Sequence, residues 1–406
     1  MALVAGLALV AACSGSGSGD GGSEGAGPDA GSQATSSTEL SPFTGGDFYQ
    51  VPDQLPDGDH GTLIRYQPVD DLDVAGASAW RIMYLSEDVG GGPIAVTGTA
   101  LVPSTPASGD GRPVLTIAHG TTGIADQCAP STGPGRSELA LMGPAVEAGY
   151  LVAMSDYEGL GTPGRHPYLV GESEGRGVLD AARAAGQLPD ADPGDRMAIF
   201  GYSQGGHGAL WAGQLADEWT PEFDLVGTVA GAPATELPVI VRAAGSLPIA
   251  GFLYMIIAGF NDAYPDEAPL TAVLTAEGEA RLSVVDQACV GDVIGQFAGS
   301  DSSALLVPGG LTSGTWAALA EENDPGNVST EAPVLILHSA ADDTVPAALS
   351  QLLADRMCDV GQVVERRVYE RGQSHVDAVP DAVDDGLAWI GQRLAGEDPV
   401  STCPAG

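Results

Sequence analysis

The sequence predicts an α/β fold, with a mostly parallel central sheet and helices on both of its faces. Short runs of continuous apolar residues, rather than alternating ones, indicate strands that are buried on both sides. Segments with helical spacing of apolar residues separate these runs, and strands that alternate with helices are typical of a parallel sheet. The apolar runs are residues 113–118, 151–154, 197–200, 226–230 and 333–337.

The chain before these runs predicts an antiparallel start to the sheet. Alternating apolar and β-branched side chains, separated by Asp, Gly and Pro, occur at residues 60–69, 79–86 and 94–102. The predicted helices are residues 177–187, 206–219 and 346–358. A strand at 363–369 and a last helix after residue 375 complete the expected sheet.

Composition limits the classes of partner. The chain has 406 residues, 44% of them hydrophobic, which is enough for one large core or a core with a subdomain. The formal net charge is −39, and all 15 basic residues are Arg. A surface this acidic repels phosphate backbones, so the composition argues against a nucleic-acid partner.

The N-terminus has the features of an export signal. Residues 1–12 are apolar but too short to span a bilayer, and they end in small residues before Cys13. This pattern resembles a bacterial lipoprotein cleavage site, at which Cys13 would carry the lipid anchor, although no Lys or Arg precedes the apolar run. Residues 13–44, rich in Gly and Ser, are expected to form a flexible tether. The alternative is a disordered N-terminus with an incidental cysteine; the first interpretation predicts a cell-surface lipoprotein or secreted protein.

Four further cysteines support export. An even number of cysteines in an exported chain suggests two disulfides, for which three pairings are possible. None has CxxC or CxxH spacing, so the sequence supports no metal site, and no cofactor is expected. These cysteines are Cys128, Cys289, Cys358 and Cys403.

One long segment interrupts the alternation of strands and helices. Some 90 residues follow Ala234 before the next predicted strand, and they include an apolar run, 247–260, that Gly and Pro interrupt. An insertion of this size at the edge of a sheet predicts a cap over an active site, and the alternative is a helical decoration. The expected domains are the first part of the core at 45–235, the cap at 236–326 and the second part of the core at 327–406.

A pentapeptide motif predicts a nucleophile. Gly201-Tyr202-Ser203-Gln204-Gly205 follows a buried strand and precedes a helix. A sharp strand-to-helix turn of this kind exposes the serine hydroxyl at the carboxyl edge of an α/β-hydrolase sheet. Ser203 is therefore the predicted nucleophile.

A serine needs a base, and the base of this fold is a histidine late in the chain. His375 follows the strand at 363–369 in a polar loop before the last helix, and it is the predicted base. The other histidines lie in an early strand region, in a loop, at strand ends or on the helix after Ser203, and they are His60, His166, His119, His338 and His207.

The orienting acid is expected after the preceding strand, where the sequence offers Asp342 and Asp343. Two adjacent aspartates cannot both point at one imidazole. We predict Asp342 as the acid, with Asp343 capping the helix that Pro346 begins.

The oxyanion of the tetrahedral intermediate needs hydrogen-bond donors. One predicted donor is the backbone N–H of Gln204. The other is expected in the loop after the strand at 113–118, with Thr121 as the natural candidate and Thr122 or Asp126 as alternatives. A plain Gly-rich turn is the other interpretation of this loop.

Several motifs together resemble the secretory lipase family, the lipase-A-like α/β-hydrolases. They lie at residues 119–131, 155–161 and 201–206, with the 342–346 turn and the Ser374-His375 pair, and the similarity covers roughly residues 45–403. The resemblance implies a triacylglycerol lipase or esterase with an inserted cap, and disulfides Cys128–Cys289 and Cys358–Cys403. It also implies that Asp156 anchors a loop. Cys13 and the tether depart from the eukaryotic members, and the cap cannot be matched residue by residue, so acyl-chain preference does not carry over.

The sequence therefore predicts a monomeric serine ester hydrolase that acts outside the cytoplasm on small-molecule or lipid esters. We expect contact with a membrane only through a lipid anchor at Cys13. The alternatives are a serine peptidase or acyltransferase with the same triad, and a surface binding lipoprotein whose site is vestigial.

Overall fold

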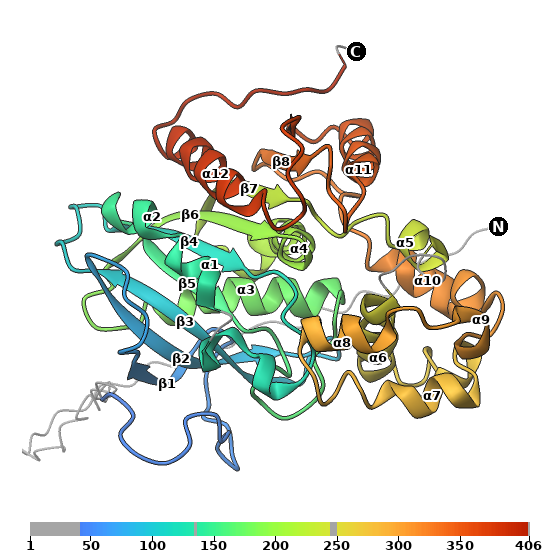
Figure 1. Cartoon of the computed structure of the whole chain (residues 1–406). Helices are drawn as coiled ribbons and strands as arrows, with labels where there is room; N and C mark the ends of the chain where they lie inside the picture. The colour runs from blue at the N-terminus through green and yellow to red at the C-terminus, as the bar shows by residue number, and fades with distance from the viewer. Residues whose placement is uncertain (1–40, 134–135, 244–249, 405–406) are drawn as a thin grey trace, which may run out of the picture. The chain divides into compact units, whose positions relative to one another are not determined.

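A computed structural model describes residues 41–133, 136–243 and 250–404 of the chain. The predicted signal segment, Cys13 and most of the predicted tether lie outside the described residues. The described part contains a nine-stranded sheet (Figure 1). Its strands are β1 (Leu63–Pro68), β2 (Ala77–Glu87), β3 (Pro93–Pro103), β4 (Arg112–Ala118), β5 (Leu151–Ser155), β6 (Pro193–Tyr202), β7 (Asp224–Gly231), β8 (Val334–Ser339) and β9 (Val364–Tyr369).

The sheet combines an antiparallel start with a parallel remainder. Its order is β1-β2-β3-β5-β4-β6-β7-β8-β9. The pairs from β1 to β5 are antiparallel, and all pairs from β5 to β9 are parallel. The chain order reverses at β4, and ligands of open α/β sheets bind at the carboxyl ends of the strands beside such a reversal.

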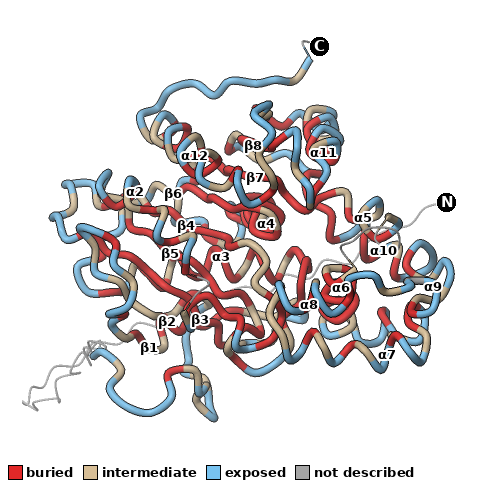
Figure 2. Tube along the Cα trace, viewed as in Figure 1, coloured by how far each residue is buried: buried red, intermediate tan, exposed pale blue. Residues whose placement is uncertain are grey.

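Helices cover both faces of the sheet. The buried side chains of the central strand β6 alternate between two hydrophobic clusters, one on each face of the sheet, so both faces need a cover of helices. Met197 and Ile199 pack on the side of α3 (Gly171–Ala185) and α4 (Gln204–Trp219), while Ala198 and Phe200 pack on the side of α12 (Val379–Leu394). The strands and the inner faces of these helices are buried, as Figure 2 shows. The predicted α/β-hydrolase fold is confirmed.

The remaining elements of the core are short or lie at its edges. The 3₁₀ turns η1 and η2 and two short helices follow β4, and α11 follows β8 and packs on β8 and β9. Their bounds are η1 (Asp126–Cys128), η2 (Pro130–Thr132), α1 (Ser137–Ala140), α2 (Gly143–Glu147) and α11 (Ala347–Asp359).

Helix α3 begins six residues before the predicted helix at 177–187. Its first turns contain glycines, which lower helix propensity and hide the helix from pattern analysis. The glycines are required by packing: a Cβ on Gly175 would lie 3.0 Å from the backbone nitrogen of Ala212 on α4. Close contact between α3 and α4 thus overrides propensity.

A helical segment lies between β7 and β8, where the cap was predicted. It has its own hydrophobic cluster, to which Leu253, Ile257 and Phe260 of α6 contribute. Among the described residues, no helix is both long and apolar enough to cross a bilayer. The elements of the segment are α5 (Leu237–Ala243), α6 (Ala250–Ala263), η5 (Leu270–Ala272), α7 (Ala276–Leu282), α8 (Val290–Phe297), α9 (Ser302–Leu305), η6 (Gly310–Thr312) and α10 (Gly314–Glu322).

The two ends of this segment are joined by one arginine on α11. Arg356 donates to Glu236 Oε1 at 2.6 Å, where the segment begins, and forms an ion pair with Asp324 at 3.1 Å, where it ends. The Asp324 carboxylate also accepts a 2.7 Å hydrogen bond from the Glu236 backbone N–H. These contacts hold the first and last residues of the helical segment next to each other, beside α11 of the core.

Candidate active site

Ser203 occupies the sharp turn between β6 and α4. Its backbone has φ 62° and ψ −120°, a combination that non-glycine residues rarely adopt. The turn is held by its neighbours: the Ser203 N–H donates to Gly231 O on β7 at 2.8 Å, and the Ser203 carbonyl accepts from His207 N at 3.2 Å. The serine is therefore fixed in a strained conformation at the carboxyl edge of the sheet.

The glycines of the motif are required by close packing. A Cβ on Gly201 would overlap the carbonyl of Gly205, and a Cβ on Gly205 would overlap the carbonyl of Ala118 at the end of β4. A Cβ on Gly206 would lie 2.8 Å from Gly231 O. Backbone meets backbone on both sides of the turn, so a larger residue would displace Ser203.

Ser203, His375 and Asp342 lie in hydrogen-bond contact, although 172 and 33 residues separate them along the chain. The Ser203 hydroxyl is 2.9 Å from His375 Nε2, and His375 Nδ1 is 2.7 Å from Asp342 Oδ2. The carboxylate accepts the Nδ1–H, which leaves Nε2 to accept the serine proton. The three side chains come from the loops after β6, β8 and β9, all at the same edge of the sheet.

The Asp342 carboxylate is stabilised in its ionised form. Burial alone would raise its pKa, but hydrogen bonds from His338 and His375 outweigh burial and hold the pKa well below its usual value. The backbone N–H groups of Thr344 and Val345 donate to its other oxygen at 2.9 and 2.7 Å. A carboxylate that meets donors on both oxygens stays charged and keeps its direction.

The predicted role of Asp343 as a helix cap is wrong. Helix α11 begins at Ala347 after Pro346, without a side-chain cap. The Asp343 carboxylate instead accepts the His375 backbone N–H at 3.1 Å. The two adjacent aspartates therefore both accept hydrogen bonds from His375, Asp342 from the ring and Asp343 from the backbone.

The loop after β4 lies directly beside the turn that carries Ser203. A Cβ on Gly120 would be 3.9 Å from the Ser203 Cβ. The Gly120 N–H donates to the buried Glu138 carboxyl at 2.9 Å, and the Thr121 hydroxyl meets the Tyr168 hydroxyl at 2.7 Å. Within the described part of the chain, neither the Thr121 N–H nor the Gln204 N–H donates a hydrogen bond. Both predicted oxyanion donors thus remain available to a ligand.

The two alternative donors have other surroundings. The Thr122 carbonyl accepts the Val290 N–H at 2.8 Å, and its hydroxyl is buried without a partner among the described residues. Asp126 interacts with the backbone of Gly161, and burial raises its pKa.

The other histidines have structural partners. His119 Nδ1 donates to Gly120 O at 2.6 Å, and His338 Nε2 donates to Val345 O at 2.9 Å. His60 lies 2.7 Å from the buried Asp180. His166 and His207 belong to a buried polar cluster next to Ser203, described below.

Asp156 holds the loop after β5. It is fully buried, and it accepts a 2.8 Å hydrogen bond from the Ser131 N–H and one of 2.7 Å from the Thr97 hydroxyl. No contact joins it to Ser203 or His375 among the described residues, which agrees with the loop-anchor role that the resemblance implies.

Ser203 lines an apolar pocket of about 650 Å³, a volume that includes the part open to solvent. Its walls come from α5 and α6 of the helical segment, from the turn that leads into α11, and from Tyr168 and Leu169 in the loop before α3. Phe252 and Ile256, which line it, belong to the apolar run noted in the sequence. The main apolar lining residues are Val239, Ile240, Phe252, Ile256, Val345 and Leu349.

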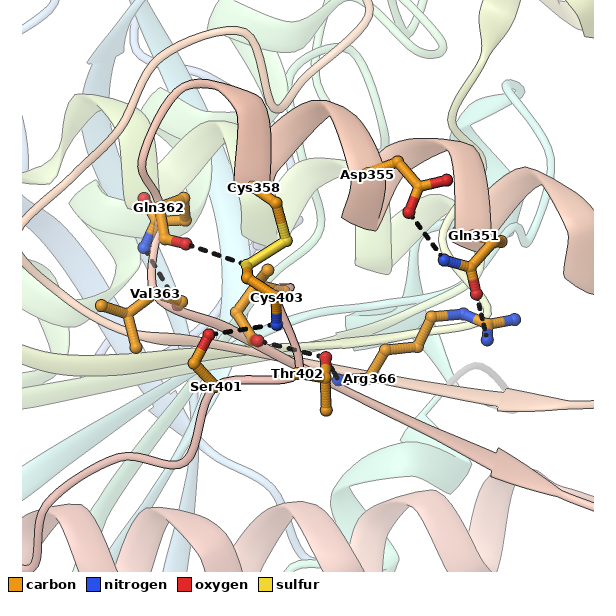
Figure 3. The surroundings of a disulfide bond; sticks show 10 residues. Gln351, Asp355, Cys358, Gln362, Val363, Arg366, Ser401, Thr402 and Cys403 are labelled. Carbon is orange, nitrogen blue, oxygen red and sulfur yellow. Dashed lines mark hydrogen bonds between the residues drawn. A yellow bond between two sulfur atoms is a disulfide. The ribbon is translucent and has the colours of Figure 1, made fainter. Parts of the chain in front are cut away.

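The cysteines form two disulfides, Cys128–Cys289 and Cys358–Cys403, the pairing that the family resemblance implies. The first joins η1, beside the Gly120 loop, to the start of α8. A β-bridge between Gly123 and Cys289 reinforces it. The second ties α11 to the irregular C-terminal segment that follows α12 (Figure 3).

Removal of each disulfide is expected to have a different effect. Replacing Cys128 and Cys289 by serine should lower the melting temperature, since a chain-entropy model gives about 5 kcal/mol for a closure over 161 residues. It should also lower kcat about tenfold, because the loop with Thr121 loses an anchor. Differential scanning calorimetry and ester kinetics measure both effects.

The matched control is the replacement of Cys358 and Cys403 by serine. Its closure over 45 residues corresponds to about 4 kcal/mol, and its surroundings in Figure 3 contain no predicted catalytic residue. We expect lower stability with unchanged kcat. Equal losses of kcat in the two double variants would contradict a link between Cys128–Cys289 and the site.

Sequence reasoning missed several residues that hold the site. The Tyr202 hydroxyl donates to His375 O at 2.7 Å, and Ser339 Oγ donates to Gln373 O at 2.6 Å. His338 also lies 3.3 Å from Asp342. Tyr202 is the first of the two variable positions of the motif, but nothing local indicates a partner 173 residues away. Among the described residues, no group of three or more His, Cys, Asp or Glu side chains could hold a metal ion.

The sheet order, the strained serine after β6 and the contacts among Ser203, His375 and Asp342 define an α/β-hydrolase. A family model described as secretory lipase matches residues 130–402, more than half of the chain. The chain therefore belongs to the secretory lipase family, as its motifs predicted.

Individual relatives agree with this assignment. The chain is 26% identical to the "Secreted triacylglycerol lipase LIP4" of Malassezia globosa, over 88% of this chain and 82% of the relative. It is also 26% identical to the "Probable inactive lipase MT1628" of Mycobacterium tuberculosis, over 86% and 82%. In fold it is similar to Candida antarctica lipase A, with a TM-score of 0.74, 24% identity and coverage of 85% of this chain and 84% of that one.

Membership of this family makes the chain an ester hydrolase of the lipase and esterase class. The family and the two disulfides indicate an exported protein, because disulfides persist in oxidising compartments.

Proposed function

We propose that this protein is an extracytoplasmic serine hydrolase that cleaves carboxylic esters, triacylglycerols among them, through an acyl-enzyme on Ser203. One observation carries the proposal. A serine held at φ 62° contacts a histidine that contacts an aspartate with a buried side chain, and the same serine lines an apolar pocket. This arrangement combines an activated nucleophile with a place for an acyl chain.

In the first step Ser203 Oγ forms a bond to the ester carbonyl carbon. Its proton passes to His375 Nε2, 2.9 Å away, and the carbonyl electron pair moves onto the oxygen. The Asp342 carboxylate at Nδ1 holds the ring in the required tautomer and stabilises the imidazolium that forms. The intermediate then expels the alcohol, which takes the proton from Nε2.

In the second step water resolves the acyl-enzyme. His375 takes a proton from water, the hydroxide attacks the acyl carbon, and Ser203 leaves with the proton from Nε2. The carboxylic acid is released and the resting state returns. Both tetrahedral intermediates carry an oxyanion, for which the N–H groups of Gln204 and Thr121 are the proposed donors.

The substrate is proposed to place its acyl chain in the pocket beside Ser203. Val239, Ile240 and Phe252 offer an apolar wall without a charged group, which suits a hydrocarbon chain better than a peptide. Residues 236–326, whose α5 and α6 line this pocket, then act as a cap. The export route, with a lipid on Cys13, belongs to the same proposal and is supported by the sequence pattern alone.

The test is a series of p-nitrophenyl esters from acetate to laurate, compared with aminoacyl p-nitroanilides. We expect ester hydrolysis and a kcat/KM that rises with chain length by up to about fourfold per methylene, since each buried methylene contributes about 0.8 kcal/mol.

Ala243→Phe, which places a ring in the pocket, should remove most of the gain in kcat/KM for laurate and leave the kcat/KM for acetate unchanged. Val360→Phe, at an exposed position after α11, is the control.

Other outcomes separate the competing functions. Faster cleavage of the anilides than of the esters would identify a peptidase. A folded protein without turnover on either series would identify a vestigial site, as the name of the Mycobacterium relative indicates for that protein. Either result would contradict the proposal.

A further inference from the structure

A buried polar cluster lies next to Ser203, between the start of α4 and the helix α3 that packs on it. Glu174 on α3, together with His207 and Gln204 on α4 and His166 in the loop between β5 and α3, forms its centre. All four side chains are almost completely inaccessible to solvent. Fully buried polar groups are costly unless every one is satisfied, so their retention needs an explanation.

The Glu174 carboxylate is the hub of this cluster. Its Oε1 accepts hydrogen bonds from Gln204 Nε2 at 2.8 Å and from the Leu169 N–H at 3.0 Å. Its Oε2 forms an ion pair with His207 Nδ1 at 2.7 Å. One carboxylate thus fixes a side chain on α4 and the backbone of a loop at the same time.

The two histidines define the protonation of the cluster. His207 Nε2 faces the Asn323 carbonyl at 2.8 Å, so both of its ring nitrogens meet acceptors and the ring is an imidazolium. Attraction to Glu174 raises the pKa of His207 against the effect of burial, which alone would lower it. His166 is the opposite case, because burial lowers its pKa to about 4 and its Nε2 accepts from Gln204 Nε2 at 2.8 Å.

Both donors proposed for the oxyanion depend on groups that Glu174 holds. Gln204 supplies one donor from its backbone, and its side-chain amide is fixed by Glu174 and His166. Leu169, with a strained φ of 58°, follows Tyr168, whose hydroxyl contacts Thr121. Thr121 supplies the other donor.

We propose that Glu174 is a positioning residue for ester hydrolysis, which aligns the two oxyanion donors through the Gln204 side chain and through the Leu169–Tyr168 loop. His207 is its buried counter-ion. The inference rests on the proposed function and deepens it. Oxyanion donors act only when they are held in place before the charge develops, and a misplacement of about 1 Å costs up to 10²-fold in rate.

The first test is Gln204→Met, which keeps the backbone N–H and the length of the side chain but removes both anchoring hydrogen bonds. We expect kcat on p-nitrophenyl butyrate to fall about tenfold with little change in KM. The pH dependence of kcat should stay unchanged, because His375 keeps its contacts. The matched control is Gln214→Met on the same helix, whose side chain accepts the Gly326 N–H at 2.7 Å. This variant should lose some thermal stability and keep its kcat.

A second variant, Glu174→Gln, removes the charge that holds both the Gln204 side chain and the Leu169–Tyr168 loop. Its kcat should fall at least as far as that of Gln204→Met. Equal kcat values for Gln204→Met, Gln214→Met and the parent protein, with melting temperatures lowered alike, would overturn the proposal and leave the proposed function intact. A Gln204→Met variant whose kcat/KM falls only because KM rises, with kcat unchanged, would also overturn the proposal. A parent protein that is folded but inactive would instead refute the proposed function, so the two failures are distinguishable.

Discussion

Replacing Ser203 by alanine is expected to lower kcat on p-nitrophenyl esters by about 10⁴- to 10⁶-fold, the largest effect of any single substitution in this chain. The methyl group of alanine cannot form the acyl-enzyme, so only binding and the oxyanion donors remain. Stability should change little, because the lost contact is one hydrogen bond to His375 Nε2 and such a bond contributes about 1 kcal/mol. Steady-state kinetics and thermal unfolding measure both quantities.

A suitable control is Ser350→Ala on α11. Ser350 is fully buried, and like Ser203 it is hydrogen bonded, but its partners are Ala347 and Arg366. It should lose stability and keep its activity. A Ser203→Ala enzyme with more than about a hundredth of the parental kcat would show that another group performs the attack.

The second large effect is expected for Asp342→Asn, with a loss of about 10⁴-fold in kcat. An amide that donates toward His375 Nδ1 favours the wrong tautomer, in which Nε2 carries the proton and cannot accept the serine proton. The neutral side chain also fails to stabilise the imidazolium. The kinetics of the variant on a short soluble ester measure the loss without a contribution from acyl-chain binding.

Asp343→Asn is the matched control for this prediction. Its side chain accepts only the backbone N–H of His375 at 3.1 Å, so we expect a loss of about tenfold or less. A larger loss for Asp343→Asn than for Asp342→Asn would assign the acid role to Asp343.

The lowered pKa of Asp342 also gives the sign of a pH effect. A carboxylate whose pKa is lower in the folded than in the unfolded state stabilises the fold at neutral pH, and this contribution is lost as the pH falls through the lowered pKa. Asp342 thus stays ionised throughout the mildly acidic range. Protonation of Asp342 should therefore not reduce activity in that range, which the kcat of the parent protein measured across mildly acidic pH checks.

The fold and the positions of Ser203, His375 and Asp342 were predictable because their signals are local. A G-x-S-x-G motif between a buried strand and a helix identifies one turn, and parallel strands bring all later loops to the same edge. The chain order of the strands then leaves few places for a base and an acid. Here the local pattern and the global topology agree.

The supporting contacts were not predictable, because each pairs residues that are far apart in the sequence. Gln204 meets His166 and Glu174, and Tyr168 meets Thr121, across 30 to 47 residues. A buried Glu174 within a helix of mixed composition looks like a solvated residue. Only the packing of α3 on α4 brings it to Gln204 and His207.

The error at Asp343 has a similar cause. Local rules favour an aspartate as a helix cap, and the turn before Pro346 offered one. The folded chain offers Asp343 a different partner, the backbone N–H of His375, which lies 32 residues later in the sequence. The sequence shows the nearby helix start but not the distant loop, so it predicted the helix cap.

The most direct measurement of the central claim is the mass of the peptide that a fluorophosphonate probe modifies. The account predicts one phosphonyl group per chain, located on Ser203, with labelling abolished in Ser203→Ala, strongly slowed in Asp342→Asn and unchanged in Ser350→Ala. A label on another residue, or no label on a folded protein that hydrolyses esters, would contradict it.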